Sequence, residues 1–389
     1  GSFNRNYLRM KYTFFFCLFF LGGMLLSNGQ AKYQSENVVI TYQKNKTEVR
    51  VAENQQLQIN VSPKDAEKIK SRGFVRYIDF GARGDGKADD IDAIAAAHAF
   101  ANEHGIPVKA DDGATYYISG KSRTAVIRTN TDFGKANFII DDTGVENRNA
   151  DVFLVSSSQK AFKPEGISSL KRNQEKINVT FPGTCIVTVS NSNIKRYIRF
   201  GPNQNNGSAQ TDIFIADNDG KVDMDAPIIW DFDQITEITA LPIDVTTLTI
   251  TGGRFTTIAN QAESKYTYYS RGIAIRRSNV IVDGLEHRVT GEGDHGAPYG
   301  GFINIGDCAY VKVQNSILTG RKMYQTIGSA GVTVSMGSYD LSVNRALNVS
   351  FVNCSQTNDI NDSRYWGILG SNNCKNLVYD NCTFSRFDA

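Results

Sequence analysis

Polar stretches in the C-terminal half of the chain contain the side chains that could move protons. The candidate catalytic residues are three carboxylates and one imidazole: Asp294, His295, Asp359 and Asp362. Cleavage of a glycosidic bond by water needs one carboxylic acid, which protonates the leaving oxygen, and one carboxylate, which activates water or attacks the sugar. Asp294 together with Asp362 or Asp359 can supply this pair. These residues therefore favour glycoside hydrolysis by paired carboxylates.

Elimination is the second chemistry that the same stretches can support. A lyase needs a base that removes the proton α to a uronate carboxylate, and a cation or arginine that neutralises this carboxylate. His295 or Lys322 can be the base, with Arg321 or Arg364 as the neutralising group. Hydrolysis needs no metal or cofactor, whereas Ca²⁺ could serve a polysaccharide lyase acting on a uronate-containing glycan. Both reactions stay open, with hydrolysis favoured.

Aromatic and charged side chains accompany these groups and suit a sugar chain. Aromatic faces stack on the C–H faces of sugars, and arginine forks bind carboxylates or neighbouring hydroxyls. The candidate substrate-binding residues are Tyr269, Arg271, Tyr299, Arg321, Lys322, Tyr324, Arg364, Trp366, Arg386 and Asp388. We therefore expect a polysaccharide or oligosaccharide as substrate. The alternative is that these polar stretches are simply solvated.

A strand pattern that occurs five times between Leu248 and Phe384 must position these residues. The copies are Leu248-Thr249-Ile250, Val280-Ile281-Val282, Val311-Lys312-Val313, Val349-Ser350-Phe351 and Leu377-Val378-Tyr379. They recur about every 30 residues with almost no helix pattern, which is typical of the stacked coils of a solenoid. The first and third residues of each copy point inward, so that like residues form columns. A further column consists of Phe255, His287, Leu318, Gln356 and Phe384, which predicts a structural role for His287.

A loop follows each of these strands, and equivalent loops of a solenoid stack on one side. The expected second strands of the coils are 272–275, 302–305, 332–334 and 367–369. The expected loops are 256–271, 288–300, 319–331 and 357–366, with 385–389 starting a fifth. They should form one continuous wall. Asp294 and Asp362 then stand two coils apart, about 10 Å by sheet spacing, which is nearer the inverting separation of about 6.5–9.5 Å than the retaining one.

A motif near the N-terminus carries a family resemblance. Residues 79–90 read Asp-Phe-Gly-Ala-Arg-Gly-Asp-Gly-Lys-Ala-Asp-Asp, and an alanine-rich helix is expected at 91–101. This stretch resembles the N-terminal module of right-handed parallel β-helix proteins, the pectate-lyase-like superfamily that includes polygalacturonases. The resemblance implies an all-β fold, a right-handed parallel β-helix solenoid with a short N-terminal capping helix. The same module begins hydrolases, lyases, epimerases and phage tailspikes, so that it does not decide the chemistry.

The comparison with polygalacturonases does not transfer a catalytic site. That family carries Asn-x-Asp, Asp-Asp, Gly-His-Gly and Arg-Ile-Lys on successive coils. Only Gly293-Asp294-His295-Gly296 approximates one of these motifs. The leading hypothesis is therefore a carbohydrate-active enzyme that cleaves glycosidic bonds in a polysaccharide. A polysaccharide lyase and a non-catalytic glycan-binding β-helix are the alternatives.

The chain organisation predicts export. Arg9 and Lys11 precede an apolar run at 14–26, too short for a spanning helix, so that residues 10–31 are expected to be a signal peptide. Residues 32–73 are expected to form a small β-rich leader, and residues 74–389 a parallel β-helix that continues past Ala389. The expected location is secreted or periplasmic, with no membrane span in the mature chain. We expect a monomer.

Composition narrows the partners and the redox chemistry. A formal net charge of +2 in 389 residues argues against a nucleic-acid partner bound by bulk charge. The odd number of cysteines after the leader favours free thiols in the core, with a Cys354–Cys382 disulfide as the alternative. Strands are expected to continue from 126 to 235, including 177–180, with a hairpin turn at 217–220. A Ca²⁺ site in the acidic stretch 217–225 is the less favoured interpretation, since the spacing is not that of a calcium loop.

Overall fold

The computed structural model describes residues 31–35, 38–43, 46–51, 56–59, 61–262, 268–293, 299–357, 365–366, 368–369, 373–385 and 387–388. Within these ranges side chains are described from Val61 onward, except at 324, 366, 368–369 and 387–388. The chain divides into two compact units, residues 1–67 and 68–389, and each is described by itself.

The first unit contains a small antiparallel sheet whose strands pair in chain order. The strands are β1 (Ala31–Ser35), β2 (Val38–Gln43), β3 (Lys46–Val51) and β4 (Gln56–Ile59). The sequence predicts strands at 38–42 and 57–61, where the structure has β2 and β4. Helix α2 (Pro63–Arg72) follows, longer than the single turn expected at 65–70.

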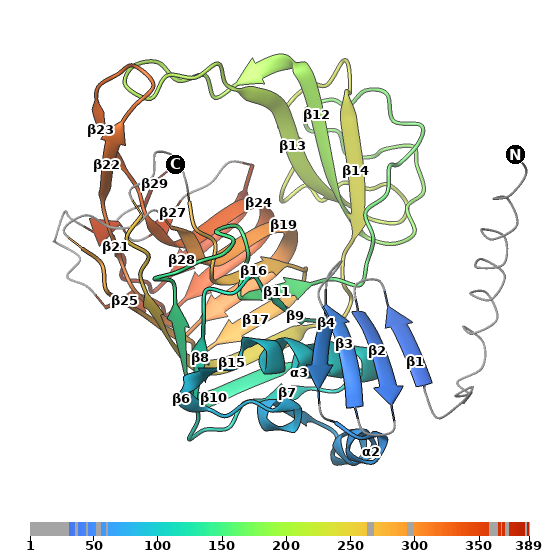
Figure 1. The fold of residues 1–389 in the computed structure, drawn as a ribbon. Helices are drawn as coiled ribbons and strands as arrows, with labels where there is room; N and C mark the ends of the chain where they lie inside the picture. The colour runs from blue at the N-terminus through green and yellow to red at the C-terminus, as the bar shows by residue number, and fades with distance from the viewer. Residues whose placement is uncertain are drawn as a thin grey trace, which may run out of the picture. The chain divides into compact units, whose positions relative to one another are not determined.

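The second unit is a right-handed parallel β-helix (Figure 1). Its coils pair in the register that the repeat predicts: Leu248 with Val280, Val280 with Val311, Val311 with Val349, and Val349 with Leu377. The strands are β15 (Leu248–Ile258), β17 (Val280–Asp283), β19 (Gly300–Gln314), β24 (Tyr339–Val352) and β28 (Lys375–Asp380). The inward columns are buried in the first four of these coils and half-buried at Leu377 and Tyr379 of the last, which confirms the solenoid.

The N-terminal coils are built by the module around residues 79–101. Their elements are β5 (Val75–Arg76), η1 (Tyr77–Phe80), β6 (Asp85–Asp89), α3 (Ile91–His104), β7 (Val108–Lys109), β8 (Thr115–Ile118), β9 (Ala125–Ile127), β10 (Thr131–Asp141) and β11 (Phe153–Ser156). The Asp90 carboxylate accepts the backbone N–H groups of Arg83 and Gly84, while Asp89 accepts that of Ile91. These bonds join the glycine turn to α3, which contacts β5, β7 and β9 and closes this end of the stack.

A stacked aromatic column runs through the second side of the coils. Tyr116, Phe138, Phe255 and His287 are register partners on successive coils. The rings of Phe138 and Phe255 stack with centroids 4.6 Å apart and planes 14° apart. The later strands on this side are β18 (Glu286–Thr290), β20 (Ile317–Leu318) and β25 (Ser355–Gln356). The column predicted from Phe255 to Gln356 is therefore confirmed, and it extends to the N-terminal coils.

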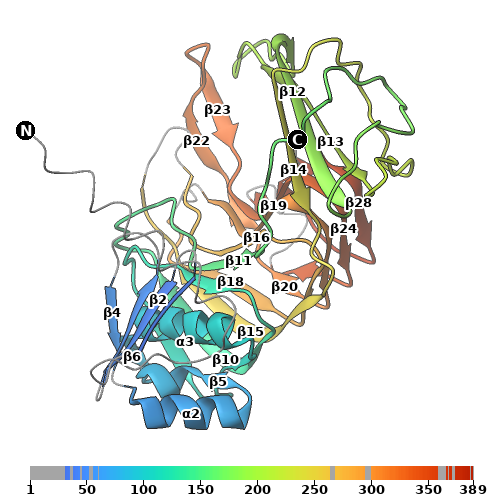
Figure 2. The ribbon, with the colours of Figure 1, turned by 90° about the vertical axis from the view of Figure 1, so that its right-hand side faces the viewer.

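The third side of the coils corrects one expected strand. Ile273, Ile303, Leu341 and Ile368 are register partners, through β16 (Ile273–Arg276), β19, β24 and β27 (Ile368–Leu369). The sequence predicts a coil strand at 332–334, and this prediction is wrong, because Leu341 takes that place in the column. Residues 332–334 belong mainly to β23 (Thr333–Met336), which forms a projecting antiparallel hairpin with β22 (Tyr324–Ile327) (Figures 1 and 2). Similarly, β29 (Phe387–Asp388) pairs with β27, where the sequence predicts the start of a loop.

An insertion separates two coils that pair directly with each other. β10 pairs with β15, in the register Phe138 to Phe255, although residues 157–247 lie between the coils in sequence. These residues form a separate antiparallel sheet, in the order β13 (Ser208–Ala216), β12 (Cys185–Arg196) and β14 (Glu237–Pro242) (Figure 2). The strand predicted at 177–180 is absent, and the turn predicted at 217–220 is present, with Gly220 N–H donating to the Asp217 carbonyl.

The insertion has its own core and packs on the coils. Phe214, Phe232 and Val187 belong to its apolar core. On its other face Ile213 and Ile215 pack against Ala309 and Leu347 of the β-helix. Lys375 of β28 lies 2.8 Å from the buried Asp212 carboxylate.

Two ladders of small residues line the coil corners. The Cys354 and Cys382 side chains occupy equivalent positions as free thiols, so that the alternative of a disulfide between them is wrong. Asn315, Asn353 and Asn381 each adopt a left-handed backbone conformation with φ near +50°. Their side-chain amides donate along the stack, Asn353 to Asn315 at 3.3 Å and Asn381 to Asn353 at 2.7 Å.

Candidate functional site

The loops that follow the second side of the coils lie against one another. Gly300 N–H donates to the Tyr269 carbonyl at 3.0 Å, joining the first two loops. Lys322 Nζ donates to the Gly293 carbonyl at 2.8 Å, joining the second and third. The third and fourth loops pair as strands, β21 (Arg321–Lys322) with β26 (Tyr365–Trp366). The predicted continuous wall of loops is therefore present in the described residues.

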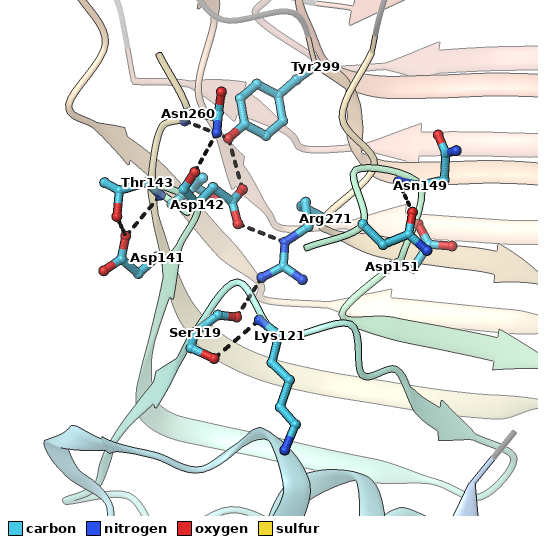
Figure 3. A network of polar contacts seen from close by, with 12 residues as sticks. Ser119, Lys121, Asp141, Asp142, Thr143, Asn149, Asp151, Asn260, Arg271 and Tyr299 are labelled. Carbon is cyan, nitrogen blue, oxygen red and sulfur yellow. Dashed lines mark hydrogen bonds and ion pairs between the residues drawn. The ribbon is translucent and has the colours of Figure 1, made fainter. Parts of the chain in front are cut away.

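A buried ion pair joins this wall to the N-terminal coils. Arg271 Nε donates to Asp142 Oδ1 at 2.7 Å, and both side chains are excluded from solvent. The Tyr299 hydroxyl donates to Asp142 Oδ2 at 2.8 Å, and Arg271 also donates to the Ser119 carbonyl at 2.8 Å (Figure 3). Burial raises the pKa of the Asp142 carboxyl, and the opposing pull of Arg271 is the largest counteracting effect. This arrangement fixes the first two loops on the coil before them.

A second buried cluster lies on the next coils around Asp340. His287 Nδ1 lies 2.8 Å from Asp340 Oδ1, and Arg321 Nε donates to the same oxygen at 3.2 Å. Burial lowers the pKa of His287, which is therefore neutral and donates its Nδ1 proton to Asp340. His287 Nε2 then accepts from the Thr257 hydroxyl at 2.8 Å. The imidazole also stacks on Phe302 with centroids 3.6 Å apart, so that the predicted structural role of His287 is confirmed.

Arg321 connects the two clusters. Its guanidinium carbon lies 4.3 Å from the centre of the Tyr299 ring, whose hydroxyl donates to Asp142. Burial acts to raise the pKa of Asp340, but the hydrogen bond from His287 and the charge of Arg321 outweigh it and lower that pKa. Asp340 is therefore an anion held by buried donors, which suits it to positioning and not to proton transfer. Asp142 has the same positioning role, because Arg271 and Tyr299 occupy its two oxygens.

Glu292 has the properties of a proton donor. Its carboxyl is half-buried in the second loop, and Oε1 accepts the Lys322 N–H at 3.4 Å. Burial raises the pKa of Glu292, although Arg321 and Lys322 act in the opposite sense. A carboxyl whose pKa is raised by burial is the kind of group that serves as a general acid. Sequence reasoning missed it because its partners come from another coil; its position between Gly291 and Gly293 was the available signal.

Asp151 is a second carboxyl with a raised pKa. It lies just before β11, and burial raises its pKa to about 6, against the attraction of Arg276 and Arg271. Figure 3 shows Arg271 between Asp142 and Asp151. The sequence gave no sign that Asp151 is buried, since it stands in a polar stretch far in sequence from both arginines.

For most of the predicted catalytic and binding residues, the proposed role remains a prediction. Six lie outside the described residues: Asp294, His295, Asp359, Asp362, Arg364 and Arg386. The side chains of three others, in β22, β26 and β29, are not described: Tyr324, Trp366 and Asp388.

The remaining five predicted binding residues are described and lie together on the wall. Tyr269 and Lys322 are half-buried, and the Tyr269 ring packs on Tyr299 with centroids 5.7 Å apart. Arg271, Tyr299 and Arg321 are buried and occupied by the contacts given above. These three therefore support the wall, and direct contact with a substrate stays a prediction for all five.

The described residues hold no group of three His, Cys, Asp or Glu side chains placed to bind a metal ion. Within the same ranges, no helix has both the length and the apolar character needed to cross a bilayer.

Comparison with solved structures identifies distant structural likenesses. No protein-family model and no curated protein match the chain. Among solved structures it is similar to the tailspike protein gp49 from Pseudomonas phage LKA1, at 15% identity and a TM-score of 0.37 over 79% of this chain and 59% of that one. It is also similar to PfbA, a surface adhesin of Streptococcus pneumoniae, at 14% identity and a TM-score of 0.32, over 79% and 56% of the two chains.

A third similar structure is the A-module of the mannuronan C-5 epimerase AlgE4 from Azotobacter vinelandii, at 12% identity and a TM-score of 0.21, covering 81% of this chain and 96% of that one. The chain spans less than two thirds of the tailspike and of the adhesin. Likenesses this distant carry no argument about function. The assignment of the β-helix rests on the coil pairing of the chain itself.

Proposed function

We propose that the protein is an exported β-helix enzyme that hydrolyses glycosidic bonds in a polysaccharide. The observation that carries the proposal is Glu292, a half-buried carboxyl with a raised pKa on a wall of tyrosines and basic side chains. Export rests on the signal-like segment 10–31.

The proposed reaction uses Glu292 as the general acid. Its proton passes to the glycosidic oxygen as the bond from that oxygen to the anomeric carbon breaks. A water oxygen bonds to the anomeric carbon and gives its proton to a second carboxylate, for which Asp294, Asp359 and Asp362 remain the candidates. The buried pairs Asp142–Arg271 and Asp340–Arg321 hold the loops that carry these groups.

Elimination on a uronate-containing glycan is the second candidate. The observation that favours it is Lys322, because Lys322 Nζ is fixed at the Gly293 carbonyl beside the predicted residues Asp294 and His295. Lys322 or His295 could accept the α proton, with Arg364 as the predicted neutralising group, while the buried Arg321 stays paired with Asp340. Ca²⁺ could share the neutralising role.

The test begins with turnover on polygalacturonate, alginate, xylan and mannan. New reducing ends without the ultraviolet absorbance of an unsaturated uronate indicate hydrolysis, and the two signals together indicate elimination. Binding to a glycan without either signal would favour a non-catalytic glycan-binding protein.

Replacement of the proposed acid gives the sharper test. We expect Glu292→Gln to lower kcat by about 100-fold or more, because the general acid is lost. Wild-type activity should fall as pH rises through the pKa of Glu292, and this limb should be absent from the residual activity of Glu292→Gln. Glu286→Gln, in the adjoining strand β18, is the matched control. Unchanged kcat in Glu292→Gln contradicts the assignment.

A further inference from the structure

A cavity outside the charged clusters lies between the insertion, the first loop of the wall and the β22–β23 hairpin. Its volume is about 240 Å³, and its described lining includes Tyr268, Tyr339, Asn203, Gln204, Asn205 and Ser335. Segments far apart in sequence build it. Figure 1 shows the loop of the insertion reaching toward the tip of the hairpin.

Backbone hydrogen bonds hold the walls of this cavity. Arg199 and Asn205 exchange backbone hydrogen bonds at 3.2 and 3.0 Å, which closes a tight loop at the end of β12. Ala330 N–H, at the tip of the hairpin, donates to the Pro202 carbonyl in the middle of that loop at 3.1 Å. The cavity is therefore part of the fold and not a gap between independent surfaces.

The floor of the cavity is aromatic and continuous with the wall. The Tyr268 and Tyr339 rings lie nearly parallel, with centroids 6.3 Å and planes 24° apart. Both tyrosines adjoin the wall in sequence: Tyr268 directly precedes Tyr269, and Tyr339 directly precedes Asp340. Tyr339 and Asp340 begin strand β24, where successive side chains point to opposite faces. A ligand in the cavity would therefore sit across one strand from the Asp340 cluster.

We propose that this cavity binds one sugar unit of a glycan chain that extends across the wall. The half-buried Tyr268 ring offers a face for the C–H face of a sugar, and the buried Tyr339 ring stacks on it. The side-chain amides of Asn203, Gln204 and Asn205 both donate and accept, which matches hydroxyl groups that do the same. No carboxylate belongs to the described lining, and the volume suits a single ring and not a longer segment. This inference rests on the proposed action on glycans and names a binding subsite for it.

In this proposal the insertion takes part in glycan binding. It supplies the amide side of the subsite, while the coils supply the tyrosines. Affinity at the subsite comes from a sugar unit away from the reacting bond. A variant that loses the subsite should therefore have a higher KM on long substrates and a kcat that is little changed.

Two variants test the subsite in different ways. Tyr268→Ala removes half of the aromatic floor, and Tyr310→Ala, which removes an exposed tyrosine elsewhere, is its control. Gly328→Ala removes no lining group, but its new Cβ would overlap the Pro202 carbonyl oxygen and push the hairpin off the insertion. Gly183→Ala is its control, since a Cβ there meets nothing within 4 Å. Circular dichroism and thermal melting establish that all four proteins fold.

Binding is measured by calorimetry with hexasaccharides of galacturonate, mannuronate, xylose and mannose, and turnover with the matching disaccharides and polysaccharides. We expect Tyr268→Ala and Gly328→Ala each to weaken hexasaccharide binding by about 5- to 10-fold, in the range of one aromatic contact. KM on the polysaccharide should rise by a similar factor, with disaccharide turnover unchanged.

Three outcomes separate this inference from the proposed function. Wild-type turnover with equal hexasaccharide affinity in both variants overturns the subsite and leaves the hydrolase intact. Binding that both variants weaken, without any turnover, supports the subsite and contradicts the enzyme. Binding of none of the four hexasaccharides by the wild-type protein overturns the subsite.

Discussion

Buried charge pairs fix the geometry of the loop wall at the level of single residues. Asp142, Arg271, Arg321 and Asp340 are all almost fully buried, and each carboxylate meets a guanidinium. Removing one member of such a pair leaves the other as an uncompensated buried charge, which is more costly than an absent pair. None of the four is therefore a neutral position for substitution.

Asp340→Asn should destabilise the protein strongly. The variant keeps the shape of the side chain but leaves Arg321 without its carboxylate and turns an amide toward His287. We expect a loss of about 3–5 kcal/mol in the free energy of unfolding, measured by urea denaturation. The control is Asp380→Asn, at an exposed position of β28. Equal stability of the two variants would show that the Asp340 cluster is not a stabilising element.

Replacement of Asp151 should stabilise the protein, in contrast to replacement of Asp340. The pKa of Asp151 is raised from 3.8 to about 6, so that between these values the folded protein holds a proton that the unfolded chain has lost. Stability therefore falls as pH rises through this window, by up to about 3 kcal/mol. Asp151→Asn should be more stable than wild type at neutral pH, and the difference should vanish below pH 3.8.

Urea denaturation at several pH values checks this prediction, with the exposed Asp225→Asn as control. A wild-type stability that does not decline across the window would contradict it.

The sequence identified which residues are polar and aromatic, but not which of them are buried. Arg271 and Arg321 stand in loops, and a loop arginine is ordinarily solvated. Their carboxylate partners cannot be found by spacing, because Asp142 is separated from Arg271 by 129 residues. Glu292 was visible in the loop, yet its burial depends on side chains from the next coil.

The stacked columns of inward apolar side chains set the positions of the coil strands. The repeat of inward apolar residues predicted the register of successive coils because each coil places the same position over its neighbour. Where the chain leaves this repeat, local pattern no longer decides the pairing. Residues 332–334 alternate like a coil strand but pair with β22, since antiparallel and parallel partners need the same strand pattern.

Phe138→Ala tests the aromatic column. Phe138 is fully buried, stacks on Phe255 and also contacts Phe133 and Phe153 edge to face. We expect the variant to lose about 3–5 kcal/mol of unfolding free energy, because it leaves a cavity between two coils.

Val378→Ala removes a side chain that is 50% exposed on β28, and it should change stability by less than about 0.5 kcal/mol. Thermal melting of both variants gives the comparison. A loss of under about 1 kcal/mol in the Phe138→Ala variant would mean that the neighbouring side chains collapse into the space.

The insertion and the β-helix form one assembly at the scale of the whole second unit. Lys375 Nζ lies 2.8 Å from Asp212, and donates to the Ile213 and Pro227 carbonyls of the insertion. The Lys375 side chain is 12% exposed, and this burial lowers its pKa. This contact is one charged anchor beside the small apolar cluster at Ala309 and Leu347, and the ion pair of Arg277 with Asp244 of the insertion, at 3.5 Å, is another.

Lys375→Met should loosen this junction selectively. Asp212 would remain buried without its cation, which costs about 3 kcal/mol or more. Amide hydrogen exchange should become faster in β12 and β13, and stay unchanged in β17 on an inner coil. Lys312→Met, at an exposed position of β19, is the control. Equal acceleration in β17 would show that the substitution acts on the whole unit.

The direct pairing of β10 with β15 has a consequence for how the chain folds. Neighbouring coils elsewhere join residues about 30 positions apart, whereas Asn130 and Thr249 at this junction are 119 positions apart. Closing the longer loop costs only about 1 kcal/mol more entropy, because the penalty grows with the logarithm of length. Contacts between distant positions nevertheless form slowly. The coils on either side should therefore assemble first, and the seam between them should be the last part of the stack to close.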